Sequence, residues 1–400
     1  MGKDTLFVGL DTDKRHIDVA VAEGDRGGEV RYWGKIANEP ASVDRVIRRL
    51  SKGGKRLEVC YEAGPCGYGL YRRLNGRAGV RCQVIAPSLT PRRPGSRVKT
   101  NRRDALVLAR LLRAEELTSV WVPDAAHEAL RDLVRARGAA VADLMRCRQR
   151  ISGFLLRQEL GYSGKPWTGK HRAWLGQIEP QEQAHRLMLA EMLSALDQAQ
   201  GRLERLRDHI VELAPGWSLA WQVKALQVLR GFAFINAVVV TAEIGDLRRF
   251  ERPRELMGFV GLVPSEHSSG DRVRRGGLTK TGNGRARKAL IEAAWTYARP
   301  AKPPTASQHP EALLAIADKA RHRLSRRYRQ LLNHGKRPQV AVAAVARELA
   351  GFLWAVARSA GEKAANASRP ADRRATLPAR STPTPALPRK RGRGHDAVSL

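Results

Sequence analysis

The chain has 400 residues, and 42% of them are hydrophobic, which is enough for two or three domains with buried cores. Lys and Arg number 72 against 39 Asp and Glu, and the resulting net charge of +33 repels itself unless it meets a polyanion, so the composition favours a nucleic-acid partner. We expect no membrane contact, because no apolar stretch reaches the roughly 18–20 residues that a span requires.

The first domain shows strand and helix patterns in alternation. Three apolar or alternating runs predict a meander of strands at 5–10, 16–22 and 30–36. Helices and strands are then predicted in turn, at 43–50, 57–61, 68–74, 82–86 and 101–114. The order β-β-β-α-β-α-β-α predicts an α/β domain, a mixed sheet with helices on its faces, and it is the order of the RNase H fold.

The middle of the chain is predicted to be helical. Two helices cover residues 125–160, and a polar linker containing Gly, Pro and Trp follows them. Between 181 and 213 apolar residues recur in steps of three and four, which predicts a coiled coil or a helical hairpin. The same seam fits a plain amphipathic helix within one subunit, so dimerisation through it is one of two alternatives.

The rest of the chain is expected to be mainly α-helical. A compact segment at 217–297 has a Gly-rich basic loop in its middle, and helices are predicted at 311–332 and 340–357. Beyond residue 363 the composition turns to Pro, Arg, Ala, Ser and Thr, which cannot bury an apolar core and predicts disorder. The chain is thus divided into a catalytic domain, a linker with a coiled-coil segment, a small C-terminal domain, a helical extension and a basic tail, at 1–160, 161–216, 217–300, 301–362 and 363–400.

Acidic residues stand at the ends of three predicted elements in the first domain. Asp11 ends the first strand, Glu62 ends the fourth strand, and Asp104 begins a helix. If the first and fourth strands are neighbours, these side chains converge, and converging carboxylates favour Mg²⁺. Two such ions would support an in-line phosphoryl displacement. Each acid also has a plainer explanation. Asp11 can shape a turn, a strand-end Glu such as Glu62 is usually a solvated rim residue, and Asn101 with Asp104 fits a helix N-cap with an acidic third position.

Short motifs make the chain recognisable. They are GLD at 9–11, EAGP at 62–65, KTNRRDA at 99–105, AEIGD at 242–246, GLVP at 261–264, SSG at 268–270 and KTGN at 280–283. In this order they resemble the insertion-sequence one-ten family of transposases. The resemblance implies an RNase H-like (RuvC-like) domain with an Asp-Glu-Asp-Asp site for Mg²⁺, DNA as the substrate, and a non-coding bridge RNA that selects target and donor DNA.

The resemblance also assigns roles to the acidic residues. Asp11, Glu62 and Asp104 match the first, second and last acids of the family's site. The third falls on Asn101, where the family commonly has Asp. An amide oxygen can ligate a metal without adding negative charge, so we expect a weaker second ion or a larger role for Asp104. Asp13 is a weaker alternative ligand.

A serine is expected to complete the site. Ser269 matches the family's nucleophile, and Ser268 beside it is the rival. In the family this serine comes from the C-terminal domain, usually of another subunit, which implies a homodimer or homotetramer. A serine hydroxyl is a poor nucleophile without a base or a metal, and His267 is too close in sequence for useful geometry, so we expect activation by the metal site. Without the resemblance, two serines before a glycine indicate an ordinary turn.

Two basic patches are predicted to contact a nucleic-acid backbone. The first, beside the metal site, comprises Arg92, Arg93, Arg97, Lys99, Arg102 and Arg103. The second, after the serine, comprises Arg272, Arg274, Arg275, Lys280, Arg285 and Arg287. Guanidinium groups bind phosphate strongly but read little sequence, which suits targeting by base pairing with an RNA. A solvated loop is the alternative for the second patch, and the family's helix-hairpin-helix turn is blurred here at 229–234.

Three other functions fit part of the sequence. A Holliday-junction-type metal nuclease explains the carboxylates and the charge but leaves the serine idle. A non-catalytic nucleic-acid-binding relic of a transposase fits Asn101 and the blurred turn. An actin-like ATPase fits Asp11, but no Gly-rich adenosine motif supports it.

The cysteines and the N-terminus bear on the location of the protein. No signal peptide precedes the first strand pattern. Neither disulfide nor zinc spacing is found among Cys60, Cys66, Cys82 and Cys147. We therefore expect a reduced, cytoplasmic protein.

Overall fold

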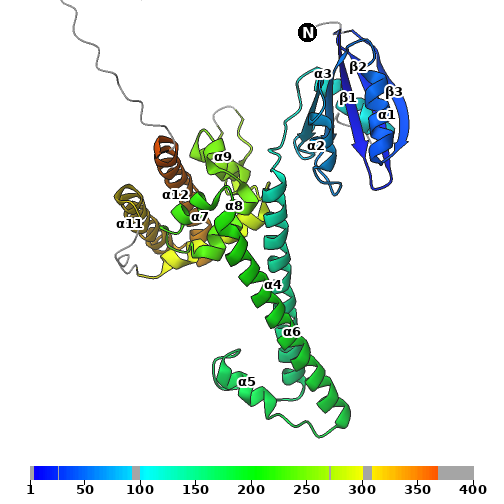
Figure 1. Ribbon diagram of the computed structural model, residues 1–400. Coiled ribbons are helices and arrows are strands. Elements are labelled where there is room, and N and C mark those ends of the chain that lie inside the picture. Colours follow the sequence, from blue (N-terminus) through cyan, green and yellow to red (C-terminus); the bar gives the residue numbers. More distant parts are fainter. Residues whose placement is uncertain (1–3, 26, 92–99, 270–271, 301–308, 368–400) are drawn as a thin grey trace, which may run out of the picture. The chain divides into compact units, whose positions relative to one another are not determined.

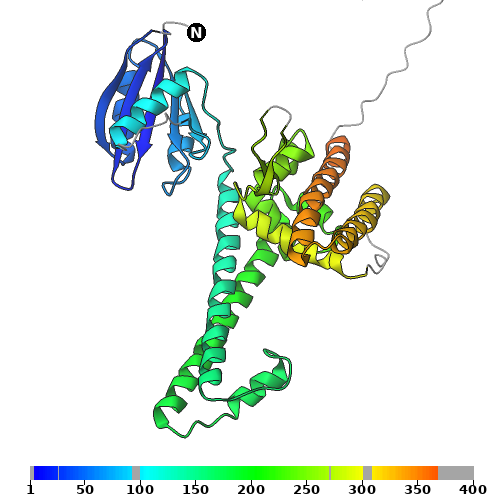
Figure 2. The ribbon, with the colours of Figure 1, turned by 180° about the vertical axis from the view of Figure 1, so that it is seen from behind.

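The computed structural model describes residues 4–25, 27–91, 100–269, 272–300 and 309–367. The chain folds into two compact units, Met1–Ala129 and Leu130–Leu400, each with hydrophobic clusters of its own. Figures 1 and 2 show the elements of both units from opposite sides. The finer division into five parts stays a prediction. Outside the described residues lie the chain from 368 onward and four members of the first basic patch, Arg92, Arg93, Arg97 and Lys99.

A five-stranded mixed sheet forms the centre of the first unit. Its strands are β1 Thr5–Thr12, β2 His16–Glu23, β3 Val30–Ala37, β4 Arg56–Glu62 and β5 Val80–Ile85. Their order in the sheet is β3-β2-β1-β4-β5; β1 and β4 are parallel, as are β4 and β5, and the other two pairs are antiparallel. The prediction of a mixed sheet in the RNase H order, with the first and fourth strands as neighbours, is confirmed.

Helices cover both faces of this sheet (Figures 1 and 2). They are α1 Pro40–Leu50, α2 Gly69–Asn75 and α3 Asn101–Arg113. On one face, Val8 and Val59 share a hydrophobic cluster with Val46 of α1. On the other face, Phe7 and Cys60 belong to the cluster that α3 covers. Because the strands are apolar on both faces, the sheet is buried between two layers of helix.

Gly9 allows α3 to lie directly on β1. A Cβ atom at this position would come within 2.4 Å of both the carbonyl oxygen of Ala105 and the backbone nitrogen of Ala109. Any larger residue would therefore push the helix away from the strand. Since side chains alternate along a strand, Gly9 and Asp11 share the face that α3 covers. The glycine of the GLD motif thus fixes the position of the helix that carries Asp104.

The second unit contains a pair of long helices. They are α4 Ala125–Arg157 and α6 Gln183–Leu213. The segment between them contains the short helix α5 Gly169–Gly176. Ile151 and Phe154 of α4 share a hydrophobic cluster with Leu189 and Leu196 of α6. The apolar seam predicted at 181–213 therefore packs as a helical hairpin within one chain. Dimerisation through this pair stays a prediction.

A mainly helical domain follows the long pair, and its elements share one large hydrophobic cluster. In chain order they are η1 Ala214–Gly216, α7 Ala220–Leu226, α8 Phe234–Ile244, η2 Leu247–Arg249, α9 Pro253–Phe259, β6 Pro264–Glu266, β7 Arg275–Leu278, α10 Gly284–Ala294, η3 Trp295–Ala298, α11 Glu311–Asn333 and α12 Pro338–Ala367. The strands β6 and β7 were not expected from the sequence, which indicated a Gly-rich loop. They pair antiparallel, with Pro264 opposite Leu278 and Glu266 opposite Arg275.

Helix α12 corrects one expectation about the composition. Its segment Pro338–Gly361 has the length and the apolar character of a membrane span, with a mean hydropathy of 1.7, although no such stretch was anticipated. Half of the most apolar 18-residue stretch of this segment is buried inside the protein. Val345, Leu349 and Leu353 have no exposed surface and belong to the cluster shared with α9, α10 and α11. The apolar side of α12 therefore serves the core of the C-terminal domain.

Candidate functional site

Asp11 and Glu62 occupy equivalent positions on neighbouring parallel strands. The register of β1 and β4 pairs Leu10 with Tyr61, so the next residue on each strand is one of the two acids. Both acids are half-buried. Oε1 of Glu62 accepts a hydrogen bond of 3.1 Å from the hydroxyl of Thr90. The predicted meeting of the first and fourth strands therefore brings these two acids to one edge of the sheet.

Helix α3 begins at the same edge. Ala105, near the start of the helix, lies at Gly9. Arg113, at the end of the helix, donates hydrogen bonds of 3.2 Å and 2.8 Å to the carbonyls of Glu23, the last residue of β2, and Gly28. Because Glu23 pairs with the start of β1, the helix runs antiparallel to β1. The helix N-terminus is consequently directed toward the Asp11 end of the strand.

A threonine cap starts this helix. The hydroxyl of Thr100 accepts a 3.4 Å hydrogen bond from the backbone nitrogen of Arg103, as an N-cap residue does. Asp104 is half-buried in the first turn, whereas Asn101 is exposed at the first helical position. The sequence predicted a cap at Asn101, but the cap residue is Thr100 and Asn101 is the first residue of the helix. The capping hydrogen bond does not involve the Asp104 carboxylate, so it does not compete with a metal role for Asp104.

The four predicted ligands offer only oxygen donors, which suits Mg²⁺. In the part of the chain that the structure describes, however, no three His, Cys, Asp or Glu side chains form a closed group around a metal position. Strand register sets Asp11 beside Glu62 and α3 starts at the same edge of the sheet, but the described carboxylates do not form a preformed metal cage. Such a donor set fits a hard divalent cation that retains several waters.

Asp13 belongs to a turn. Its Oδ1 accepts hydrogen bonds from the backbone nitrogens of Arg15 (2.7 Å) and His16 (3.1 Å), and these two bonds lower the pKa of Asp13. The side chain is exposed. The turn interpretation explains this residue without a metal.

Asp18 is a further acid at the site that the sequence analysis did not single out. It lies directly opposite Asp11 in the β1–β2 pairing and is only 5% exposed. Its Oδ1 accepts a 2.6 Å hydrogen bond from the hydroxyl of Tyr32, and the guanidinium of Arg102 stands 5.0 Å from the Tyr32 ring. The signal was present, because Asp18 interrupts the inward side of an otherwise apolar strand. These contacts link the start of α3 to the strand that faces Asp11.

The candidate serine lies on the β6–β7 hairpin. The backbone of Ser269 exchanges two 3.2 Å hydrogen bonds with Arg272. The hydroxyl of Ser268 donates to Oε1 of Glu266 (2.9 Å) and accepts from the backbone nitrogen of Arg274 (3.2 Å). The Ser269 hydroxyl has no hydrogen-bond partner among the described residues. Ser268 therefore serves the hairpin, whereas the role of Ser269 as a nucleophile stays a prediction.

A buried ion pair supports the base of this hairpin. Arg135 of α4 donates two hydrogen bonds of 2.8 Å to Glu243, whose side chain is 1% exposed. Asn283 donates a third, of 2.9 Å, while its own Oδ1 caps α10 by accepting from Arg285 and Ala286. Burial opposes the ionisation of Glu243, but the bonds from Arg135 and Asn283 outweigh it and lower its pKa.

Two glycines of the downstream motifs are required by close packing. At Gly282, where φ is +71°, a Cβ atom would lie 2.0 Å from the carbonyl oxygen of Phe259. At Gly261, where φ is +64°, it would lie 2.2 Å from the carbonyl oxygen of Thr281. The GLVP and KTGN motifs are thus largely a scaffold that holds the hairpin and the cap of α10 together.

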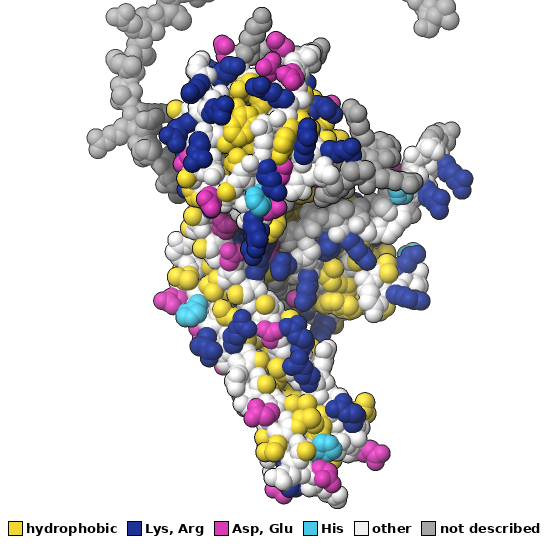
Figure 3. All heavy atoms as spheres, turned by 90° about the vertical axis from the view of Figure 1, so that its right-hand side faces the viewer, with side chains coloured by type: hydrophobic (Ala, Val, Ile, Leu, Met, Phe, Trp, Pro, Cys, Tyr) yellow, Lys and Arg dark blue, Asp and Glu magenta, His cyan; other side chains and the backbone are white. Residues whose placement is uncertain are grey.

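The described members of the two basic patches divide into exposed and structural groups. Arg287 is structural, because it donates 2.9 Å hydrogen bonds to the carbonyls of Val260 and Thr281. The side chain of Arg275 lies outside the described residues. Figure 3 shows Lys and Arg side chains spread over the face in view. The exposed members are Arg102, Arg103, Arg272, Arg274, Lys280 and Arg285.

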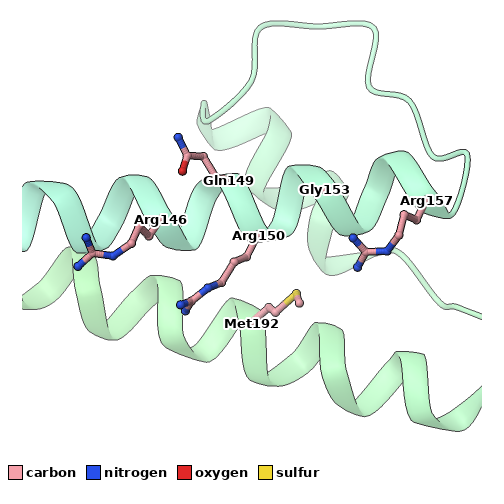
Figure 4. A pocket seen from close by; sticks show the side chains of 6 residues that line it. All are labelled: Arg146, Gln149, Arg150, Gly153, Arg157 and Met192. Carbon is pink, nitrogen blue, oxygen red and sulfur yellow. The ribbon is translucent and has the colours of Figure 1, made fainter.

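An arginine-lined hollow on the long helix pair was missed by the sequence analysis. Its walls include Arg146, Arg150 and Arg157 on one side of α4, with Met192 of α6 opposite (Figure 4). Gly153 lies between the arginines and leaves the helix surface open there. Arg146 is paired with Asp143. The spacing of four and seven residues was a usable signal, but its meaning depends on α6 lying alongside.

Comparison with known proteins agrees with this architecture. A family model for a DEDD transposase domain, described as "Transposase", matches residues 8–158, and the model described as "Transposase IS116/IS110/IS902 family" matches residues 223–309. A DEDD domain of this kind implies a divalent metal.

Curated relatives extend over most of the chain. A putative transposase y4qE of Sinorhizobium fredii is 48% identical over 88% of this chain and 89% of its own length. The transposase for insertion sequence element IS1533 of Leptospira borgpetersenii is 29% identical, over 82% of this chain and 97% of its own length. The transposase for insertion sequence element IS1111A of Coxiella burnetii is 27% identical, over 75% and 80%. The chain therefore belongs to the IS116/IS110/IS902 family of transposases, enzymes that cut DNA strands and transfer them.

Proposed function

We propose that this transposase cuts and rejoins DNA through attack of the Ser269 hydroxyl on a phosphodiester, at a site where Asp11, Glu62 and Asp104 bind Mg²⁺. The observation that carries the proposal is the β1–β4 register, which sets the first two acids side by side. The start of α3 at the same end of the sheet adds Asp104 and Asn101. The only other hydroxyl in the SSG motif, that of Ser268, is engaged within the hairpin.

Asp11, Glu62 and Asp104, with Asn101, would hold two divalent ions at the edge of the sheet where β1 lies between β2 and β4. When bound, such a pair stabilises the entering and leaving oxygens of a phosphoryl displacement. Asn101 contributes an oxygen but no charge, so the ion on its side binds more weakly. Asp18, buried beside Asp11, adds negative potential that partly offsets this loss.

The chemical step conserves the phosphodiester energy. A bond forms between Oγ of Ser269 and phosphorus, one ester bond of the DNA strand breaks, and the proton of the serine is passed to the leaving oxygen. The cut strand ends in a free hydroxyl, and the other end is held on the enzyme as a phosphoserine ester. Attack by a new DNA hydroxyl then reverses the step and joins the strands.

The serine and the acids belong to different units of the chain. The family resemblance favours a serine supplied to the acids of a neighbouring subunit in a homodimer or homotetramer. Exposed arginines around both groups would hold DNA and a bridge RNA by their phosphates. Because such contacts read little sequence, base pairing with the RNA would select the DNA sites. We expect the enzyme to act in the cytoplasm.

Covalent trapping tests the chemistry. Purified enzyme is incubated with Mg²⁺, its copurifying RNA and end-labelled DNA of the element, and the label that stays with denatured protein is measured. Ser269→Ala should abolish the labelled protein, and Ser268→Ala should retain most of it. A Ser269→Ala enzyme that still cuts DNA at full rate would show hydrolysis by water, as in a junction-resolving nuclease.

Sequencing of the copurified RNA tests the guide. We expect one abundant RNA whose loops pair with both junctions of the inserted element. Random RNA fragments without such pairing would overturn the guided mechanism while leaving the serine chemistry intact.

A further inference from the structure

A second hollow lies between α5 and the α4–α6 pair, away from every group used above. Its lining residues come from α4, from α5 and the residue before its cap, and from α6. They include Arg148, Trp167, His171, Arg172, Asp197 and Glu204. None of them belongs to the predicted catalytic groups or to the two basic patches. The hollow therefore needs an explanation of its own.

The wall formed by α5 is firmly built. Thr168 caps the helix by accepting a 3.3 Å hydrogen bond from the backbone nitrogen of His171, and Leu175 is buried in the cluster that joins α4 to α6. Trp167, just before the cap, has φ of +61°, a left-handed conformation that non-glycine residues rarely adopt. Such a backbone persists only where its surroundings hold it. Trp167 is thus presented in a fixed position.

Aromatic rings cluster in and around this wall, and two of them, Trp167 and His171, line the hollow. The ring of His171 lies 5.1 Å from that of Trp167, 5.5 Å from that of Trp174 and 4.7 Å from that of Tyr162. The guanidinium of Arg148 stands 5.3 Å from the Trp167 ring. Flat aromatic and guanidinium surfaces of this kind stack with planar ligands.

Three buried nitrogen atoms of residues that line this hollow have no hydrogen-bond partner among the described residues. They are Nδ1 of His171, Nε of Arg148 and Nη1 of Arg172. His171 is only 3% exposed, and burial lowers its pKa, so its ring is neutral near pH 7. Buried polar groups are almost always paired in folded proteins. The residues that carry these atoms line the hollow, but the three nitrogens themselves are enclosed, so the case for a ligand rests on the shape and the aromatic and charged lining of the hollow.

The charges of the hollow select among ligands. Asp197 pairs with Arg172, and Glu204 accepts a 3.2 Å hydrogen bond from Gln200. Two carboxylates beside the arginines disfavour a lone phosphate. A nucleobase instead offers a flat face for Trp167 and an edge with both donors and acceptors.

We propose that this hollow binds one unstacked nucleobase of a single-stranded nucleic acid, with the base against Trp167 and beside Arg148. The inference extends the proposed function, because an enzyme that opens DNA and carries a guide RNA exposes unpaired bases of both kinds.

Binding to short labelled strands tests the proposal. The full-length protein is titrated into RNA and DNA oligonucleotides of the same sequence, and anisotropy gives the dissociation constants. Since stacking of one base on an aromatic side chain is strong, Trp167→Ala should weaken binding by about five- to a hundredfold. Trp167→Phe should retain most of the affinity. Trp295→Ala, which removes a tryptophan that is 41% exposed elsewhere in the second unit, should change it less than about twofold.

The RNA and DNA arms identify the source of the base. If only RNA binding weakens, the guide supplies it; if only DNA binding weakens, the substrate does. Unchanged affinity of Trp167→Ala for both strands would overturn the proposal.

A scan with single abasic nucleotides needs no altered protein. One position should lose affinity with the wild-type enzyme and lose none further with Trp167→Ala, because both changes remove the same contact. Equal affinity at all positions would contradict base binding, whatever the folding of the variant.

The same preparations are assayed for Mg²⁺-dependent DNA cleavage, with Asp11→Asn as the inactive control. Absence of cleavage by the wild-type enzyme would count against the proposed chemistry alone, since the binding scan does not depend on it.

Discussion

The hydroxyl of Tyr32 donates a 2.6 Å hydrogen bond to Oδ1 of Asp18, and Asp18 faces Asp11 across the β1–β2 pair. The Arg102 guanidinium stands over the same tyrosine ring, 5.0 Å from its centre. A single side chain thus joins the third strand, the second strand and the first turn of α3. The carboxylate next to the proposed metal ligand Asp11 is consequently held in place by a neutral donor.

Removal of this hydroxyl should weaken the first unit. We expect Tyr32→Phe to lower the free energy of unfolding by about 1–2 kcal/mol, because a buried carboxylate loses its partner. Burial and the bond to Asp18 raise the pKa of Tyr32 from 10.0 to about 12. The stabilisation is therefore full below about pH 10 and is lost as pH rises to about 12. Denaturant titrations of both proteins at pH 8 and pH 11.5 measure the difference, and an equal difference at both values would contradict it.

The three acids should be individually essential. Asp11→Asn, Glu62→Gln and Asp104→Asn are nearly isosteric and should each reduce DNA cleavage by at least about a hundredfold without unfolding the protein, since the loss of a metal ligand removes charge stabilisation. The control is Asp13→Asn, whose side chain can still accept the turn hydrogen bonds. Full activity of an Asp11→Asn enzyme in a gel-based cleavage assay would remove the metal site from the mechanism.

Restoring a fourth acid at position 101 should strengthen metal binding. Asn101→Asp adds a negative charge at an exposed position in the first turn of α3, where the helix dipole also stabilises a negative charge. We expect the Mg²⁺ concentration for half-maximal cleavage to fall by about tenfold, with Asn101→Ala shifting it upward. Metal titrations at constant DNA measure this. No shift in either direction would show that residue 101 does not touch a metal ion.

The Arg135–Glu243 pair should be a large contribution to the stability of the second unit. Arg135→Met leaves a buried carboxylate with one neutral donor and should cost roughly 3 kcal/mol. Because hydrogen bonding overcomes burial and lowers the pKa of Glu243, the stabilisation is present above about pH 4.5, the ordinary value, and is lost as pH falls through the lowered one. Arg323→Met, which breaks an exposed pair with Glu348, should cost less than about 1 kcal/mol. Chemical denaturation that gave equal losses for both variants would contradict this ranking.

Much of the first unit was predictable from the sequence because its strands alternate regularly. The meander and the crossover helices follow from period and order. The adjacency of the first and fourth strands, which brings Asp11 and Glu62 together, was expected because this order is that of the RNase H fold. Asp18 escaped notice because the apolar residues on either side of it defined the strand. Its meaning depends on which residue lies opposite, and strand register is not written in local periodicity.

The second unit was less predictable, because its features arise between elements. The strands at 264–266 and 275–278 are short, and the glycines at 276 and 277 hide their alternation. The hollows beside α4 exist only because α5 and α6 lie against it. The resemblance named the serine motif, but only the hydrogen bonds of Ser268 distinguish it from Ser269.

The contact at Gly9 has a consequence for precision. The backbone of α3 at Ala105 and Ala109 and the Cβ atom of Leu108 lie so close to Gly9 that no side chain fits between strand and helix, and these atoms have no rotamers to choose from. The distance between β1 and α3 is therefore expected to vary little with thermal motion. In the proposed mechanism, the two carboxylates would then adjust their positions to a DNA phosphate by rotation of the Asp11 and Asp104 side chains, because the backbones that carry them cannot shift easily.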